Sequence, residues 1–454
     1  MNLDAELDRC VMCGMCSQHC PTYELTSNES ESPRGRIALI SALSNDQLGI
    51  SDKLVAHLEH CTGCRACEDY CPSAVRFGAI MDAARALIAK QRPQPRAQHQ
   101  IQALLAKPQQ TQRLGRWLGR YQRWGLQRLM RATGLLSLTG LSESDNLLPN
   151  QLRNAAHSST QPEYSPAVDE PGLQKRGDVA LFTGCISSIF DREALDASQR
   201  LLNRLGYGVF TPKGQTCCGA MHQHSGYPDK AAELAQTNLD VFKQLNIKAI
   251  VHTSTGCTSF LQEYNQLVSK ESFANKVQDI NEFLLNANWP SNLSIRPLPK
   301  RVAIHEPCSA RNVMHVANKP YRLLEMIPEI ECVPLPDNAL CCGASGSQLL
   351  SPSEISLSLR QKKLESLIHL KTSLDMDIKK DTKRGTDPFR KEIDTSIDTL
   401  ITTNIGCALH LAAGLREQGQ NVEVLHPVTL LFRQLEKAET CTPQLASATA
   451  KVVI

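Results

Sequence analysis

Two matching runs of cysteines near the N-terminus constrain this chain more than any other feature of its sequence. Each run has the form C-x2-C-x2-C-x3-C-P, in which short spacers turn three thiolates toward one [4Fe–4S] cluster and the fourth cysteine ligates the cluster of the other run. The runs consist of Cys10, Cys13, Cys16 and Cys20, and of Cys61, Cys64, Cys67 and Cys71. The spacing therefore predicts one cluster held by Cys10, Cys13, Cys16 and Cys71, and another held by Cys61, Cys64, Cys67 and Cys20. Zinc and free thiols are the alternatives, but a zinc site closes with four ligands and gives the third closely spaced cysteine no role.

The composition is that of a folded protein with more than one domain. The chain has 454 residues, of which 41% are hydrophobic and 21% charged, so a mainly disordered chain is excluded. A formal net charge of +3 is too balanced to indicate a nucleic-acid partner. The 18 cysteines are too sparse for a disulfide scaffold, and clustered thiols in a reducing cytosol bind metal or carry out redox chemistry. The acidic N-terminus does not resemble a secretory signal, and we expect no transmembrane helix.

Positive charge is concentrated in the middle of the chain. Between Ala83 and Ser142 there are eleven Lys and Arg residues and no Asp or Glu, so the rest of the chain is net acidic. Within Leu114–Trp124, apolar residues recur at helical spacing between arginines. Such a basic amphipathic helix suits a membrane surface, and a helix packed on its own protein or on a partner is equally consistent with the pattern. Ser, Pro, Asn and Gln then crowd Asn146–Pro171, which indicates a linker.

From about Gly177 onward the sequence repeats itself. Each copy begins with an apolar run that leads to a cysteine, continues through a CCG triplet, and closes with a second apolar run that leads to another cysteine. The cysteines of the first copy are Cys185, Cys217, Cys218 and Cys257, and those of the second are Cys308, Cys341, Cys342 and Cys407. Each apolar run reads as a strand that ends at, or just before, its cysteine and is followed by helical spacing. The pattern predicts two α/β units, called here the first and second CCG units, with cysteines at the ligand-binding edge of each sheet.

The sequence leaves the chemistry of the CCG units open. Four cysteines per unit suffice for a further iron–sulfur centre, because adjacent thiolates can bridge iron atoms and the glycine after each pair lets the backbone approach closely. Buried or redox-active thiols without metal are the alternative. Five nearby histidines are candidate ligands or proton carriers, although a histidine at a strand end more often forms only local hydrogen bonds. They are His222, His224, His252, His305 and His410. Cys332 and Cys441 fit neither pattern and are interpreted as small apolar residues.

These features divide the chain into four segments. We expect a helical ferredoxin-like domain with two [4Fe–4S] clusters over residues 1–90, and a basic helical connector and linker over 91–176. The first CCG unit then spans 177–299 and the second spans 300–454, with a highly charged surface insertion at about 371–397. The predicted fold class is therefore α/β with a helical ferredoxin-like N-terminal domain and two repeated α/β CCG units at the C-terminus. The sequence has no GxGxxG after a strand, no Walker loop and no Ser/His/Asp arrangement, so we expect no flavin or nicotinamide site in this chain.

The motifs resemble those of a known family. CVMCGMCSQHCPTYEL, ESPRGRIALI and CTGCRACEDYCPSAVRFG are similar to the iron–sulfur subunit of glycolate oxidase (glycolate dehydrogenase). CCGAMHQHSG, EPC and CCGASGSQLLSP resemble its two cysteine-rich units, which are shared with the CCG-containing subunit of heterodisulfide reductase. The resemblance covers nearly the whole chain apart from the basic middle and the insertion. The chain departs from the heterodisulfide reductase unit at Cys257 and Cys407, each of which stands alone where that unit has a C-x2-C pair.

The resemblance implies an electron-transfer subunit of an oxidoreductase. In this family the chain binds two [4Fe–4S] clusters and works with flavin-containing subunits that oxidise a 2-hydroxy acid, and electrons pass to quinone at the cytoplasmic face of the membrane. We therefore expect a cytoplasmic protein, peripheral on the inner membrane where it meets that acceptor, with substrate oxidation on a separate subunit. Alternatives are the cluster subunit of a lactate or glycerol-3-phosphate dehydrogenase, a heterodisulfide or thiol reductase acting at the CCG cysteines, and a non-redox assembly scaffold.

Overall fold

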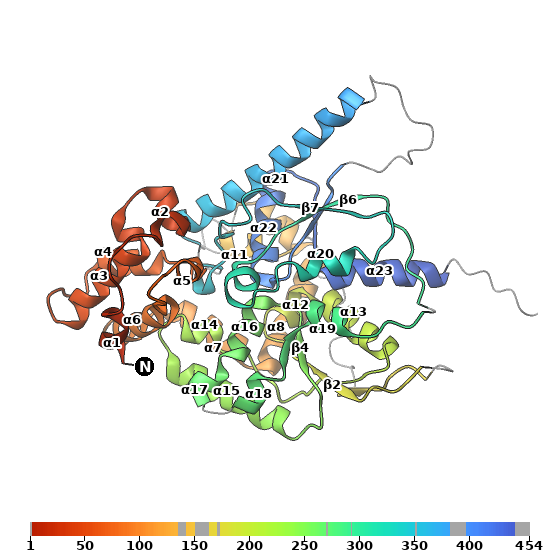
Figure 1. The fold of residues 1–454 in the computed structure, drawn as a ribbon, viewed down its shortest axis with the longest axis horizontal. Coiled ribbons are helices and arrows are strands. Elements are labelled where there is room, and N and C mark those ends of the chain that lie inside the picture. The colour runs from red at the N-terminus through yellow and green to blue at the C-terminus, as the bar shows by residue number, and fades with distance from the viewer. Residues whose placement is uncertain are drawn as a thin grey trace, which may run out of the picture.

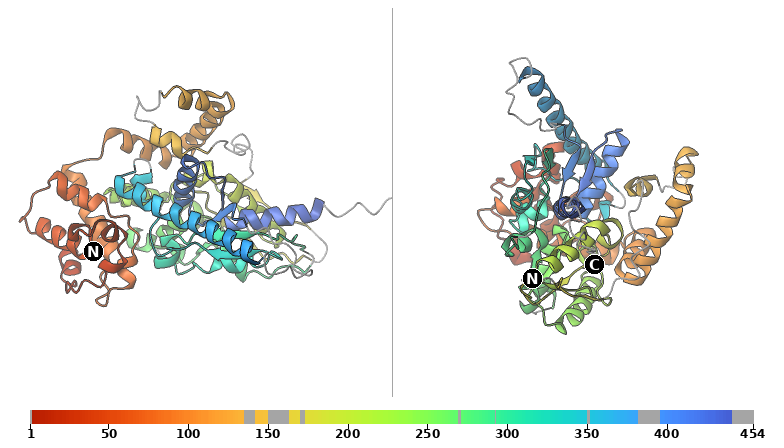
Figure 2. Two further views of the ribbon diagram at one scale, coloured as in Figure 1. Left: turned by 90° about the horizontal axis from the view of Figure 1, so that it is seen from above. Right: turned by 90° about the vertical axis from the view of Figure 1, so that its right-hand side faces the viewer.

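The computed structural model describes residues 2–134, 142–149, 163–169, 173–268, 271–291, 293–349, 352–381 and 396–440. A helical N-terminal domain, red in Figure 1, adjoins two α/β units, each built on its own sheet. A layer of connector helices, orange in Figure 2, lies along one side of these units. The architecture confirms the predicted fold class.

Short helices joined by tight loops build the N-terminal domain. The Ser32 hydroxyl begins the third helix by accepting a hydrogen bond from the N–H of Gly35. The last helix buries apolar residues at helical spacing from Phe77 to Ile88, which gives the domain its own core. The helices and 3-10 turns are α1 (Leu3–Leu7), η1 (Ser17–His19), α2 (Pro21–Thr26), η2 (Glu29–Glu31), α3 (Pro33–Ser44), α4 (Asp52–Glu59), α5 (Ala66–Asp69) and α6 (Phe77–Gln91).

The basic segment forms the helical connector. Its helices are α7 (Arg96–Ala106), α8 (Pro108–Arg123), α9 (Leu126–Ala132) and α11 (Ser142–Leu147). Residues 150–162 and 170–172 of the predicted linker lie outside the described residues. Between them, β1 (Tyr164–Ser165) joins the first sheet, a strand that the composition of this stretch does not indicate. The Tyr164 hydroxyl donates a 3.0 Å hydrogen bond to Asp178, and the Tyr164 ring packs on Phe210.

The first CCG unit carries a five-stranded sheet in the order β1-β3-β2-β4-β5, in which only β1 is antiparallel. Chain order reverses between β2 and β4, which makes a topological switch point at the carboxyl ends of these strands. The strands are β2 (Asp178–Leu181), β3 (Gly208–Phe210), β4 (Ile250–His252) and β5 (Val277–Asp279). The helices are α12 (Ser187–Phe190), α13 (Arg192–Arg204), α14 (Ala220–Gln223), α15 (Pro228–Lys243), α16 (Thr255–Gln262), α17 (Tyr264–Val268), α18 (Glu271–Ala274) and α19 (Ile280–Asn286).

The second CCG unit repeats this plan with a four-stranded parallel sheet in the order β7-β6-β8-β9, and its switch point lies between β6 and β8. The strands are β6 (Arg301–Ile304), β7 (Glu331–Pro334), β8 (Thr399–Ile401) and β9 (Glu423–Leu425). The helices are the π-helical turn η3 (Ser309–Val313), α20 (Lys319–Leu324), the 3-10 turn η4 (Gly346–Leu349), α21 (Glu354–Asp381), α22 (Ile405–Glu417) and α23 (Pro427–Thr440).

One apolar core joins the two units. It contains residues of both sheets, such as Val179 and Val302, together with Leu431 of α23, the helix that packs between the units on α13 and α20. By contrast, α21 extends away from the body of the molecule in Figure 1. The predicted insertion 371–397 begins within this helix, and its residues 382–395 lie outside the described residues.

Candidate metal and electron-transfer site

The eight N-terminal cysteines are divided between two cavities. The smaller cavity is lined by Cys10, Cys13, Cys16, Cys67 and Cys71. The larger cavity is lined by Cys20, Cys61, Cys64 and Cys67. The division agrees with the two predicted ligand sets apart from Cys67, which reaches both cavities. The assignment of individual ligands stays a prediction.

The same backbone device turns both cysteine runs. Met12 and Gly14 have φ of 56° and 80°, and the equivalent residues Gly63 and Arg65 have φ of 61° and 57°. These left-handed residues stand two and four positions after the opening cysteine of each run. Because αL residues reverse the chain locally, they let closely spaced cysteines direct their thiols to one side of the loop.

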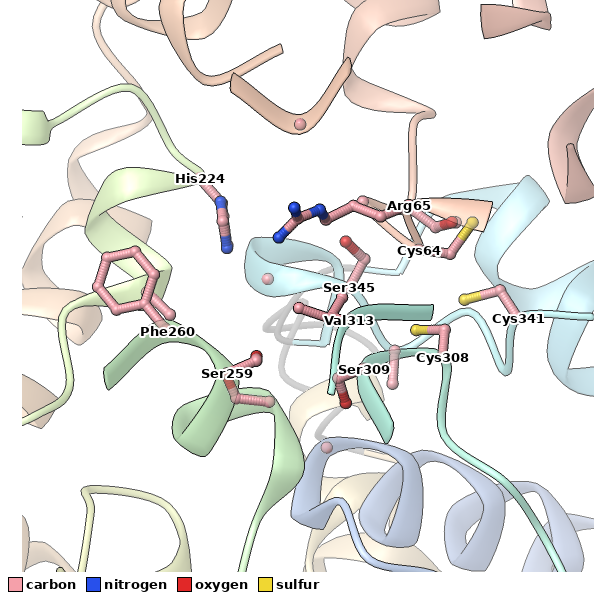
Figure 3. A pocket seen from close by; sticks show the side chains of 18 of the residues that line it. Cys64, Arg65, His224, Ser259, Phe260, Cys308, Ser309, Val313, Cys341 and Ser345 are labelled. Atoms are coloured by element: carbon pink, nitrogen blue, oxygen red, sulfur yellow. The ribbon is translucent and has the colours of Figure 1, made fainter. Parts of the chain in front are cut away.

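The larger cavity, of about 240 Å³, also receives all eight cysteines of the CCG units. Its walls come from the N-terminal domain and from both units, so segments far apart in the sequence meet there. Figure 3 places Cys64, Cys308 and Cys341 on one side of this cavity, and His224 and Phe260 on the other. The fold therefore brings one N-terminal cysteine set and both CCG sets to a single place.

In the first CCG unit the four cysteines form one contiguous set of thiols. The Sγ atoms of Cys185 and Cys217 are 3.4 Å apart, and Cys218 contacts both Cys217 and Cys257. Hydrogen bonds from Cys185 and Cys218, together with one from the N–H of Gly219, hold the pKa of Cys217 well below its usual range. A hydrogen bond from Cys218 lowers the pKa of Cys257 to about 6. Two thiols are thus favoured as thiolates, the form that binds metal.

The second CCG unit repeats this arrangement. The Sγ atoms of Cys342 and Cys407 are 2.8 Å apart. Hydrogen bonds from Cys308 and Cys342, with the N–H of Gly343 at 3.4 Å, hold the pKa of Cys341 well below its usual range. Gly343 has φ of 88°, and a Cβ there would lie 2.3 Å from a backbone oxygen of α21. Glycine is therefore required for the CCG loop to lie against this helix.

The cysteines lie slightly beyond the positions predicted from sequence. Cys185 and Cys308 stand in the loops after β2 and β6, and Cys257 and Cys407 stand in the first turns of α16 and α22. The prediction that each strand ends at, or just before, its cysteine is wrong by several residues, because a turn and a helix start come between them. All four still belong to the carboxyl edges of strands that flank the switch points.

Each unit places a buried histidine of the sheet edge beside its cysteines, but next to a different strand of the repeat. In the first unit His252 ends β4, is fully buried and contacts Cys257. In the second unit His305 follows β6, its Nδ1 lies 2.9 Å from the Thr402 hydroxyl, and one of its ring nitrogens lies within 4.8 Å of the thiols of Cys342 and Cys407. Burial lowers the pKa of His305 to about 3. The neutral imidazole is the form that can ligate metal or accept a proton.

The other three candidate histidines differ in their surroundings. His222 is buried, which lowers its pKa, and it lies near Cys217. His410 lies on α22 against Ser356 of α21. His224 lines the large cavity and its Nδ1 lies 2.9 Å from a carboxylate oxygen of Asp82 on α6. His224 therefore links the first unit to the N-terminal domain.

Polar contacts that the sequence analysis missed attach the N-terminal domain to the units. The Asn312 side chain of η3 donates a 2.8 Å hydrogen bond to the backbone carbonyl of Cys64. Arg65, the next residue, forms a 2.5 Å ion pair with Glu263 of the first unit. These partners are about 200 or more residues apart in the chain, and no local pattern in the sequence signals them.

The groups of cysteines that line the two cavities offer donor sets that fit iron–sulfur clusters. None of the described cysteines forms a disulfide. Groups of thiols converge on shared cavities, and backbone N–H groups point at sulfur in both CCG loops, a contact that tunes the potential of iron–sulfur clusters. Cys332 instead lies on β7 with its side chain against the apolar core, and burial raises its pKa to about 12. Cys441 lies outside the described residues.

Within the part of the chain that the structure describes, no helix is long and apolar enough to cross a membrane. The predicted amphipathic helix is α8, and it is partly packed on the protein. Leu118 is buried, and Gly115 lies against Ile189 of α12. Trp117 and Trp124 are exposed, so the interpretation as a packed helix accounts for only one face.

Three family models match four parts of the chain. A 4Fe-4S dicluster domain matches residues 6–75, and the linker region of the glycolate oxidase iron-sulfur subunit matches residues 97–154. A cysteine-rich domain matches twice, at residues 179–262 and 302–412. The matches coincide with the N-terminal helices, the connector and the two CCG units.

Two curated relatives match the chain over nearly its whole length, and a third matches little more than half of it. The chain is 28% identical over 447 residues to the probable glycolate oxidase iron-sulfur subunit of Bacillus subtilis, with 94% of both chains covered. It is 27% identical over 451 residues to the glycolate oxidase iron-sulfur subunit of Escherichia coli, with 96% of both covered. Lactate utilization protein A of Geobacillus is 25% identical over 261 residues, which cover 56% of this chain and 98% of that protein.

These matches support iron–sulfur clusters and an electron-transfer role for this chain. They also agree with the cysteine motifs that carry the resemblance. Over nearly its whole length, the chain resembles the iron–sulfur subunits of glycolate oxidase.

Proposed function

We propose that this chain is the electron-transfer subunit of a complex that oxidises glycolate, or a related 2-hydroxy acid, on a separate flavin subunit and delivers electrons to quinone. The proposed ligands are the eight N-terminal cysteines for two [4Fe–4S] clusters and four cysteines in each CCG unit for a further centre. Bound clusters supply one-electron transfer. The residues of the chain hold them, bury them and donate hydrogen bonds to their sulfur atoms.

The observation that carries the proposal is the shared cavity. Cys20, Cys61 and Cys64 line it together with all eight CCG cysteines. Burial and the nearby Cys341 raise the pKa of Cys64, which reflects how closely the second unit approaches the N-terminal loop. A protein that only stored metal or acted as a scaffold has no need for three cysteine sets to meet.

The test is to produce the chain alone and together with its flavin partners, anaerobically. The chain alone should not reduce a dye with glycolate, and activity should appear only when flavin subunits are added. Substrate-dependent dye reduction by the chain alone, free of flavin, would overturn the division of labour. Retained quinone reduction in a Cys218→Ala, Cys342→Ala double variant would overturn the role of the CCG units.

Lactate is the second candidate substrate, because the match to lactate utilization protein A covers nearly all of that protein. The matched length is, however, little more than half of this chain, whereas the glycolate oxidase subunits match it throughout. Comparing glycolate and lactate as electron donors in the assembled complex separates the two. The proposal for glycolate requires the larger kcat/KM with glycolate.

A further inference from the structure

The outer face of α8 and α9 is an exposed apolar surface. Trp117 and Trp124 are 60% and 74% exposed, and Leu126 and Leu129 are 44% and 60% exposed. Large apolar side chains that are exposed as one patch often mark an interaction site. These four residues are called here the tryptophan face.

Arginines are placed around the tryptophans in a regular way. Residues seven apart occupy the same side of a helix. Trp117 within α8 and Trp124 directly after its last residue therefore lie on the same side. Arg113 and Arg120 precede them by four residues each, which puts an arginine next to each tryptophan along the helix. The helix thus presents alternating arginine and tryptophan side chains outward.

The opposite face of α8 is firmly attached to the first CCG unit. Thr111, Gly115 and Leu118 are buried, and a Cβ at Gly115 would lie 3.4 Å from Ile189 of α12. The exposure of the tryptophan face is therefore a property of a packed helix and not of a detached one. Figure 2 shows these helices as an outer layer at one side of the molecule.

The charge of this surface has one sign. Neither α8 nor α9 contains Asp or Glu. Within the described part of the chain, no ion pair engages the arginines that surround the tryptophan face. They are Arg113, Arg116, Arg120, Arg123 and Arg128. The nearby Arg131 differs, because it is paired with the buried Asp145 of α11.

We propose that the tryptophan face docks on the surface of an anionic lipid bilayer. Tryptophan is enriched at the level of lipid headgroups. Arginine can keep its guanidinium among phosphates while its stem lies beside apolar chains. An uninterrupted positive charge complements anionic lipid. Tryptophan and arginine are also enriched at protein interfaces. The choice of lipid therefore rests on the uniform positive charge of α8 and α9, and a protein partner is the alternative outcome of the test.

The test is co-sedimentation of the full-length chain with vesicles. The intact chain should bind vesicles of phosphatidylcholine with phosphatidylglycerol, and added salt or pure phosphatidylcholine should weaken binding. A Trp117→Ala, Trp124→Ala variant should bind at least about tenfold more weakly. An Arg113→Gln, Arg120→Gln variant should lose about fivefold per arginine.

A matched control removes two positive charges elsewhere. Lys230→Gln, Lys243→Gln changes exposed lysines of α15 and should bind vesicles like the intact chain. All variants should keep their iron content and melting temperature, which separates loss of docking from loss of folding. Failure of the intact chain to bind anionic vesicles, or equal binding by the tryptophan variant, would overturn the proposal. If the tryptophan variant instead loses its flavin subunits while vesicle binding is absent, the face is a protein interface and the proposal is wrong.

Discussion

Asn312 in the second CCG unit and Ile189 in the first stand at the same place in the repeat, four residues after Cys308 and Cys185. Asn312 donates a hydrogen bond to the backbone of Cys64 in the N-terminal domain. Ile189 packs on Gly115 of α8, behind the tryptophan face. Equivalent positions of one duplicated plan have thus acquired different neighbours.

The local structure around these two residues also differs between the units. The second unit has the π-helical turn η3 after its opening cysteine, whereas the first has a short α-helix, α12. Single π-turns are frequent at functional sites, because the extra residue re-aims side chains. We therefore expect the second unit, which contacts the backbone of Cys64 through Asn312, to receive electrons from the N-terminal domain before the first unit does.

The largest effect is expected from replacing a cysteine of the N-terminal domain that lines the shared cavity. Cys64→Ser should remove about four iron atoms per chain, because serine is a poor ligand in a sulfur-coordinated cluster. Iron and sulfide analysis, with EPR of the reduced protein, measures the loss. Cys332→Ser is the matched control, since that thiol lies against the apolar core on β7, and it should keep the full iron content. An unchanged spectrum in Cys64→Ser would show that Cys64 is not a ligand.

A smaller effect should follow from changing Asn312 and Ile189, which occupy equivalent positions in the two units. Asn312→Leu keeps the volume but removes the donor to Cys64, which should weaken this contact by about 1 kcal/mol and slow reduction of the second unit. Ile189→Val at the equivalent position should leave that rate unchanged. Rapid-mixing absorbance of the assembled complex with glycolate measures both. If the two variants slow reduction equally, the distinction between the units is lost.

The two units should also differ in how pH affects their attachment to the N-terminal domain. Burial opposes the charged form of His224, but the Asp82 carboxylate outweighs this and raises the pKa of His224, while His224 and Arg85 help to lower that of Asp82. A raised histidine pKa stabilises the folded state below its unfolded value of about 6.5, and the contribution is lost as pH rises through the folded pKa. The second unit is attached through the amides of Asn312 and Gln348 and through an ion pair of Lys362 with Glu24, and none of these contacts involves a histidine.

Thermal unfolding as a function of pH measures this difference. The intact chain should exceed His224→Gln in melting temperature at pH 6, and the gap should close toward pH 9. Asn312→Leu should instead lower the melting temperature by a similar amount at every pH in this range. A His224→Gln gap that is constant with pH would mean that the ion pair contributes nothing.

Much of the fold could be predicted because its signals are local. The C-x2-C spacing, the CCG triplets and the apolar runs each lie within a few residues, and they correctly indicated a helical domain followed by two α/β units. The strand β1 was missed because two residues within a polar stretch carry no periodicity, and it is held by the side-chain contact of Tyr164 with Asp178. The position of each cysteine relative to its strand was off by several residues, since the turn before a helix has no hydrophobic signature.

The candidate site could be predicted only as a set of residues. The repeat identified all eight CCG cysteines, but nothing local says that they share a cavity with Cys64. Asn312 and Asp82 are ordinary polar residues in the sequence and acquire a role only through partners far away in the chain. The histidines show the same limit, because His252 ends β4 whereas His305 follows β6, and the two become comparable only once both sheets are seen.

The central prediction is that electrons reach the second CCG unit, whose Cys341 lies near Cys64, before they reach the first unit. Cys342→Ala and Cys218→Ala are equivalent changes, one in each unit, and both should be examined in the assembled complex by freeze-quench EPR after mixing with glycolate. Cys342→Ala should leave the N-terminal clusters reduced and the first unit oxidised, and Cys218→Ala should leave both the N-terminal clusters and the second unit reduced, with quinone reduction lost in both. Reduction of the first unit in Cys342→Ala at the normal rate would contradict the claim.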